Sequence, residues 1–133
     1  MKLPAPLLLI CLTLGGEACL KSDDCGQSVN AAKTSPSGRM QAGAIVSACG
    51  ATVGYYTLVV VQPSGHPVEA ERKDAALMVP GVHQIYFSWG EDGALLVDVP
   101  AGPLIEQRLE VNGVKVRYRS SLSRQAAERT LGR

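Results

Sequence analysis

The 133-residue chain has little charge and few histidines, and each shortage excludes a class of function. Charged residues make up 19% of it and the net charge is +1, so it lacks the basic surface that attracts nucleic acid or an anionic membrane. Its two histidines, His66 and His83, are isolated from other ligand residues, whereas zinc needs three or four ligands at short spacings. We therefore expect no nucleic-acid partner and no metal site.

Catalytic motifs are also missing. The sequence contains no Gly-x-Ser-x-Gly motif, no phosphate-binding loop and no dinucleotide fingerprint. Asp23-Asp24 and Glu91-Asp92 are adjacent carboxylates, but calcium loops place oxygen ligands at alternating positions over about a dozen residues. The sequence thus predicts neither an enzyme nor a bound cofactor.

The longest hydrophobic run, Leu3 to Leu14, is too short for a membrane-spanning helix, which needs about 20 residues. It follows the positively charged Met1-Lys2 and precedes small residues, a pattern typical of a secretory signal peptide. We predict a signal peptide at residues 1–18, a linker at 19–26, a β domain at 27–120 and a C-terminal tail or short helix at 121–133.

The cut site has a second interpretation, in which Cys19 becomes the lipidated first residue of a lipoprotein. Such signals carry an aliphatic residue three positions before the cysteine and then two small ones. Here these positions hold Gly16, Glu17 and Ala18, of which only the last fits well. Ordinary export to the periplasm or the exterior is favoured, and a lipid anchor at Cys19 stays open as the one route to the membrane.

Turn residues and alternating hydrophobicity predict the strand pairs. A three-residue turn at Pro36–Gly38 sets Val29 opposite Ile45 and Cys25 opposite Cys49. Directly opposed residues in an antiparallel pair are close enough for a disulfide, the normal state of paired cysteines in an exported protein. A catalytic thiol at Cys49 would need a neighbouring base, which the sequence does not offer. We predict a Cys25–Cys49 disulfide.

A second hairpin is predicted from Ile85 to Val99, with Gly93 closing a three-residue loop. Its expected pairs are Phe87 with Val97, Trp89 with Leu95, and Ile85 with Val99. This register puts Trp89 on the apolar face, so we expect it in the core and not in a ligand site.

A third hairpin is predicted from Ile105 to Ser120 around Asn112-Gly113, the dipeptide best suited to a type I′ turn. Opposite charges and apolar residues then fall on separate faces. The expected pairs are Val111 with Val114, Glu110 with Lys115, Leu109 with Val116, and Glu106 with Arg119. Arg108 opposite Arg117 is the one unfavourable pair.

Between these hairpins, Tyr55–Gln62 predicts a strand whose Leu58–Val61 run is apolar on both sides, as in a central strand covered on both faces. Ser64 to Asp74 is mostly polar and predicts a long loop or an edge segment. Ala75–Val79 predicts another strand, and Ser123–Leu131 a short helix. The fold class is all-β, with about eight short, mostly antiparallel strands in a meandering sandwich or barrel.

The chain contains the turn Ser35-Pro36-Ser37-Gly38-Arg39 and the motif Cys49-Gly50-Ala51-Thr52-Val53-Gly54, followed by Trp89 and the valine-rich Val111 to Tyr118. These motifs resemble those of small uncharacterised bacterial exported proteins and lipoproteins. The family turn has Asp where this chain has Ser37, a difference that affects only turn chemistry. The resemblance implies a compartment and a β architecture, and it implies no reaction.

These observations favour a structural or interaction module whose partner is an unknown envelope or extracellular protein. An alternative class is a small-ligand-binding or hydrolytic domain with a pocket near Tyr55, Tyr56, His66 and His83. A third is an inhibitor that presents the Ser64–Asp74 loop to a target.

Overall fold

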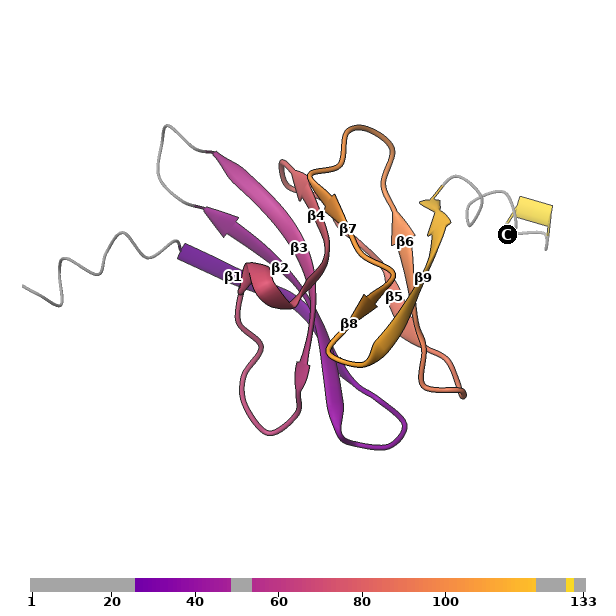
Figure 1. Ribbon diagram of the computed structural model, residues 1–133. Helices are drawn as coiled ribbons and strands as arrows, with labels where there is room; N and C mark the ends of the chain where they lie inside the picture. The colour runs from indigo at the N-terminus through magenta and orange to yellow at the C-terminus, as the bar shows by residue number, and fades with distance from the viewer. Residues whose placement is uncertain (1–25, 49–53, 122–128, 131–133) are drawn as a thin grey trace, which may run out of the picture.

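A computed structural model describes residues 26–48, 54–121 and 129–130, and it shows a β-sandwich (Figure 1). In these ranges nine strands form two sheets that face each other, and a 3-10 turn at Arg72–Asp74 lies between two strands of the first sheet. The all-β prediction is confirmed, and the two separate sheets identify the sandwich as the correct alternative.

The first sheet has the strand order β1-β2-β3-β4-β7, and the second has the order β5-β6-β9-β8. The strands of the first are β1 (Gly26–Thr34), β2 (Met40–Ala48), β3 (Tyr55–Pro63), β4 (Ala75–Pro80) and β7 (Glu106–Gln107). Those of the second are β5 (Phe87–Trp89), β6 (Leu95–Val99), β8 (Glu110–Val111) and β9 (Val114–Ser120). The 3-10 turn η2 (Arg72–Asp74) precedes β4.

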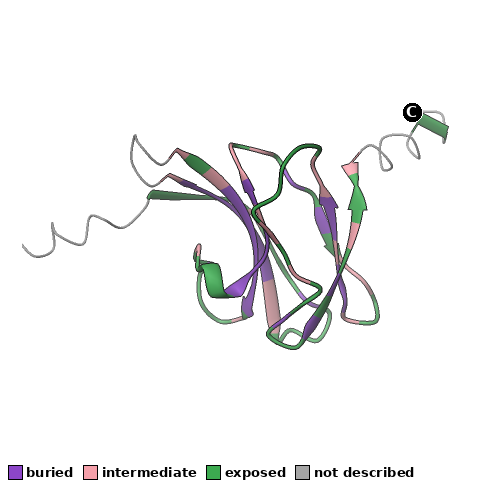
Figure 2. Ribbon diagram, turned by 45° about the horizontal axis from the view of Figure 1, so that its top comes forward, coloured by how far each residue is buried: buried purple, intermediate pink, exposed green. Residues whose placement is uncertain are grey.

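Strand β3 is the central, doubly covered strand that its apolar run predicts. Val59 and Val61 pack in the main core between the sheets, and Leu58 and Val60 pack in a second cluster on the outer face of the first sheet. All four are buried, and Figure 2 shows this burial concentrated on the middle strands of the sheet. Alternate residues of this aliphatic run therefore pack on opposite faces of the sheet, two in each hydrophobic cluster.

The second cluster is covered by the Ser64–Asp74 segment, which the sequence predicts only as a polar loop. The segment folds back over the sheet and buries Val68 to 6% exposure. Opposite it, Gly43 leaves room for this valine, because an added Cβ there would lie 3.0 Å from Val68 Cγ2. The loop thus seals its own sheet, which does not favour a role as an extended inhibitory loop.

The β1–β2 pair follows the predicted register at its open end, where Val29 lies opposite Ile45 and Gly26 opposite Ala48. A bulge between Val29 and Ala31 shifts the register by one residue, so the turn is longer than the three residues predicted. The predicted disulfide partners Cys25 and Cys49 lie just outside the described residues, and the bridge stays a prediction.

The Ile85–Val99 hairpin has the predicted register, with Phe87 opposite Val97 and Trp89 opposite Leu95. Gly93 has φ = 87°, the left-handed conformation that the three-residue loop requires. Trp89 is partly buried against the core, and its indole Nε1 donates to Lys33 O at 2.9 Å. The Lys33 Nζ in turn donates to Phe87 O at 2.7 Å, so β1 and β5 join the two sheets along one side.

The prediction for Ile105–Ser120 is right at the turn and wrong farther from it. Val111 with Val114 and Glu110 with Lys115 pair as expected around Asn112, which has φ = 52°. Glu106, however, does not meet Arg119, because β7 leaves the hairpin and pairs with β4 of the other sheet.

Strand β9 instead pairs in parallel with β6, which sets Arg119 beside Asp98. This arrangement also gives the arginines acidic partners. A long hairpin would oppose Arg108 and Arg117, whereas the structure pairs Arg108 with Glu106 and Arg117 with Asp92.

The remaining sequence predictions concern other parts of the chain. The signal peptide, Cys19 and most of the predicted C-terminal helix lie outside the described residues. Among the described residues, no helix has the length and apolar character needed to cross a membrane.

Candidate functional site

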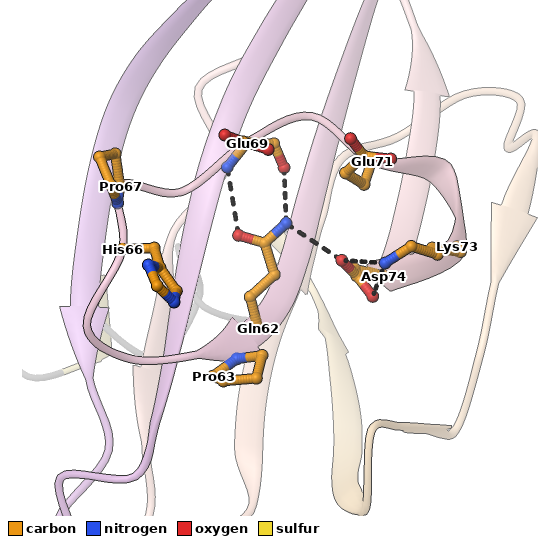
Figure 3. A pocket seen from close by; sticks show the side chains of 8 residues that line it. All are labelled: Gln62, Pro63, His66, Pro67, Glu69, Glu71, Lys73 and Asp74. Atoms are coloured by element: carbon orange, nitrogen blue, oxygen red, sulfur yellow. Dashed lines mark hydrogen bonds and ion pairs between the residues drawn. The ribbon is translucent and has the colours of Figure 1, made fainter.

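A pocket of about 390 Å³ lies between the end of β3 and the segment that folds back over the first sheet (Figure 3). The lining side chains are mostly polar and come from this short stretch of chain. They are Gln62, Pro63, His66, Pro67, Glu69, Glu71, Lys73 and Asp74.

Gln62 holds the pocket in shape. Its Nε2 donates to Glu69 O at 2.8 Å and to Asp74 Oδ2 at 3.2 Å, and its Oε1 accepts from Glu69 N at 3.1 Å. Figure 3 shows this amide reaching from β3 to both the loop and η2. A side chain near the end of β3 therefore fixes the path of the chain up to Asp74.

Asp74 is the most buried carboxylate of the pocket, with 6% exposure. Besides Gln62, Asn112 Nδ2 donates to its Oδ1 at 3.1 Å, and Lys73 Nζ lies 3.3 Å from its Oδ2. Burial raises the pKa of Asp74, but the hydrogen bonds from Asn112, Gln62 and Lys73 outweigh it and place the pKa below its ordinary value of 3.8. The carboxylate is ionised at neutral pH and engaged by several donors.

Asn112 connects this site to the second sheet. It stands in the β8–β9 turn, and its Nδ2 also donates to Val61 O at 2.7 Å. The sequence identifies Asn112 as a turn residue because its dipeptide favours positive φ, and gives no signal for these long-range contacts. Asp74 and Asn112 together fasten the second sheet to the first.

The hydrogen bonds to Asp74 limit the chemistry that its carboxylate can perform. A carboxylate that accepts hydrogen bonds from several donors and has a low pKa is a poor general base at neutral pH. Among the described residues, no group of three or more His, Cys, Asp or Glu side chains is placed to hold a metal ion. Three carboxylates against one lysine on the pocket wall favour a cationic ligand.

The structure does not bring together the residues of the predicted ligand pocket. His66 lines the pocket described here, but Tyr55 begins β3, about 26 Å away along the strand. His83 lies beyond β4, where its Nε2 is 3.0 Å from Pro80 O and its backbone N–H donates to Thr57 Oγ1 at 3.0 Å. A single pocket near Tyr55, His66 and His83 is therefore not formed.

The end of the sandwich that holds Tyr55 has a different character, and we call it the apolar end. Its exposed apolar side chains, between 39% and 62% accessible, are Tyr55, Val82, Leu104 and Ile105. Gly81 N donates to Tyr55 O at 2.8 Å, and Ile105 N donates to Met78 O at 2.8 Å. Tyr55 begins β3, Val82 follows the end of β4, and Leu104 and Ile105 precede β7, so the four residues lie at the same end of three neighbouring strands of the first sheet.

Comparisons with known proteins do not assign a family. No family model matches the chain, and neither a curated protein nor a solved structure is significantly similar to it.

Proposed function

We propose that this chain is a small exported β domain that acts as an interaction module of the cell envelope, through its apolar end. The observation that supports this role is the gathering of Tyr55, Val82, Leu104 and Ile105 at one end of the sandwich. Single exposed apolar residues are normal on a protein surface, whereas a contiguous apolar patch marks an interaction site, and we propose that these four residues form one. The proposed partner is an envelope or extracellular protein.

The position of the N-terminal segment supports this orientation. Gly26 lies opposite Ala48, and Ala48 lies opposite Tyr55, so residues 1–25 join the domain at its apolar end. A lipid on Cys19 would therefore be attached to the chain on the side of Gly26, at the end of the domain that we propose for the partner.

Photo-crosslinking in a bacterial host tests the proposal. A photoreactive residue at Val82, in the full chain with its own leader, is expected to capture one discrete envelope protein. Lys115 is the matched control, because its side chain is 76% exposed and lies outside the apolar end. Equal capture at both positions, or none at Val82 in exported protein, would contradict the proposal.

The proposed covalent state is a Cys25–Cys49 disulfide, with Cys19 as the alternative lipid site. The register supports the bridge, because Gly26 and Ala48, the neighbours of these cysteines, lie opposite each other. The intact mass of the exported protein, alkylated with and without reductant, reports the cut site, acyl chains and free thiols. Alkylation of Cys25 and Cys49 without reductant would exclude the bridge.

A second candidate function is small-ligand binding at the Asp74 pocket. The excess of carboxylates on its wall favours a small organic cation over an anion or a neutral sugar. Titration with amines and guanidinium compounds, followed by NMR shifts of Glu69 and Glu71, tests it. Glu71→Gln should weaken binding, and Glu110→Gln, outside the pocket, should not. Binding unaffected by Glu71→Gln would remove this candidate.

A further inference from the structure

A pocket of about 410 Å³ lies at the end of the sandwich opposite the apolar end. Three turns line it: the Ser35–Met40 turn between β1 and β2, the β5–β6 loop and the β8–β9 turn, all at the bottom of the molecule in Figure 1. Its volume falls within the range of roughly 300–1,000 Å³ that is usual for small-molecule sites. A neighbouring pocket of about 320 Å³ shares Asp92, Gly93 and Gly113 with it, so the two lie side by side.

The single tryptophan of the chain forms part of the pocket wall. Trp89 packs partly against the main core and also lines this pocket, together with Met40 and Val114. Its indole Nε1 donates to Lys33 O at 2.9 Å, which restrains the orientation of the ring. The pocket therefore has an apolar wall with an aromatic ring held in place.

Two charged side chains of the pocket are available to a ligand. Arg39 and Glu91 are exposed, and within residues 26–48, 54–121 and 129–130 neither the guanidinium nor the carboxylate has a hydrogen-bond or ion-pair partner. Asn112, a third polar residue of the wall, uses its Nδ2 for Val61 O and Asp74 Oδ1, so its Oδ1 is the remaining acceptor. Donors and acceptors thus stand beside the aromatic wall.

The backbone that carries these groups is held by its own hydrogen bonds. Ser35 N donates to Met40 O at 2.8 Å in the first turn, and Gly90 N donates to Ala94 O at 2.8 Å in the β5–β6 loop. The Asn112 side chain ties the third turn to β3. A ligand therefore meets a largely preformed site, which lowers the cost of ordering the protein on binding.

We propose that this pocket binds a saccharide, with one sugar ring packed on Trp89 and its hydroxyl groups hydrogen-bonded by Arg39 and Glu91. A sugar ring has C–H groups on its faces and hydroxyls around its edge, and each hydroxyl both donates and accepts. It therefore suits an aromatic wall bordered by a donor and an acceptor, whereas an anion would meet the charge of Glu91 and a cation that of Arg39.

The neighbouring pocket gives room for a second ring, so an oligosaccharide should bind more tightly than the corresponding monosaccharide. The saccharide and the protein partner proposed for the apolar end would occupy separate surfaces, and neither proposal depends on the other.

The indole N–H of Trp89 gives one NMR signal from inside the proposed site, because the chain has no other tryptophan. Titration of the full chain with tetrasaccharides of glucose, mannose and N-acetylglucosamine, each up to about 10 mM, should shift this signal saturably for at least one of them. Benzoate and benzamidine serve as anionic and cationic aromatic probes. No shift with any saccharide, or a saturable shift with these two probes alone, would overturn the proposal.

Variants at the two free charges test the hydrogen bonds. Arg39→Ala and Glu91→Ala should each weaken saccharide binding at least about fivefold, because each removes a charged hydrogen-bonding group. Arg72→Ala and Glu110→Ala are the matched controls, since these side chains are 66% and 58% exposed and lie outside both pockets. Thermal unfolding confirms that each variant is folded. Unchanged binding in both pocket variants, or equal weakening in the controls, would overturn the proposal.

The saccharide site and the proposed function can fail separately. Val82 is exposed at the apolar end, so Val82→Lys should reduce capture of an envelope partner and leave saccharide binding unchanged. Arg39→Ala should do the reverse. Loss of saccharide binding in Val82→Lys but not in Arg39→Ala would place the saccharide at the apolar end and overturn the proposed site.

Discussion

The two ends of this sandwich differ in how the chain is held. At the end that contains the Ser35–Met40 turn, neighbouring loops are fastened to one another, as when Ser64 N donates to Arg39 O at 2.9 Å. The Asp74 network adds the β8–β9 turn to the same end. At the apolar end, side chains such as Val82 and Ile105 are exposed to solvent. The buried Asp74 network therefore lies at the end opposite the surface that we propose for the partner.

The largest effect is expected from Asp74→Ala, which leaves the amides of Gln62 and Asn112 without their shared acceptor and removes a buried carboxylate. We expect a loss of roughly 3 kcal/mol in the free energy of unfolding, measured by urea denaturation. Asp92→Ala, which breaks an exposed pair with Arg117, should cost clearly less. Equal losses of unfolding free energy in the two variants would contradict a larger stabilising contribution from the Asp74 network.

The same network predicts an acid dependence. Because the folded-state pKa of Asp74 lies below 3.8, its carboxylate contributes stability above that pH and loses it as the pH falls through the folded pKa. Wild type should lose stability more steeply below about pH 4 than Asp74→Ala does. Parallel curves for the two proteins would contradict the assignment.

Tyr118→Phe should have the next largest effect. The Tyr118 hydroxyl lies 2.7 Å from Ala76 O and 2.6 Å from Arg108 O, and so links β9 to the other sheet. Its loss should cost about 1 to 2 kcal/mol. Tyr55→Phe, at the exposed apolar end, should change the free energy of unfolding by less than about 0.5 kcal/mol.

Tyr118 also predicts an alkaline limit. Burial raises the pKa of Tyr118 from 10.0 to about 12. The folded state therefore keeps its proton longer than the unfolded state, and stability is lost as the pH rises from about 10 through about 12. Tyr118→Phe should flatten this loss in thermal unfolding measured across that range.

Gly43→Ala tests the cover of the outer face, with an expected loss of about 1 kcal/mol, because the new methyl group crowds Val68. The loss should shrink in a Val68→Ala background, which removes the crowding. Gly26→Ala is the control, since its nearest non-neighbouring atom would be 3.9 Å away. A loss that persists in full without Val68 would contradict this packing.

The smallest effect on folding is expected at the apolar end. Val82→Ser and Leu104→Ser should each change the free energy of unfolding by less than about 0.5 kcal/mol, because both side chains are already exposed. Either variant should nevertheless reduce partner capture in the crosslinking experiment. A large loss of stability would show that these residues serve the fold and would weaken the proposed function.

The sequence predicts correctly the features that depend on neighbouring residues, such as tight turns and the strand pairs beside them. Gly93 and Asn112-Gly113 determine their turns, and the pairs nearest each turn follow directly. The apolar run Leu58–Val61 likewise identifies the central strand, because a run without polar residues must be covered on both faces.

Strand pairings and side-chain contacts between residues far apart in the chain could not be predicted from the sequence. Nothing local indicates that Glu106 leaves its hairpin for β4, or that β6 and β9 run parallel. Val68 is one apolar residue in a polar segment, so no period marks its burial. The Asp74 site depends on Asn112, 38 positions away, and no spacing rule connects them.

The parallel pairing of β6 with β9 has a consequence for the order of folding. Between these two strands the chain must travel back to the first sheet, place β7 against β4, and only then return as β8 and β9. A chain that becomes available for folding from its amino terminus onward would expose the β5–β6 hairpin until β9 arrives. Such delayed, non-local closure slows folding and leaves a temporary opening for proteases and chaperones.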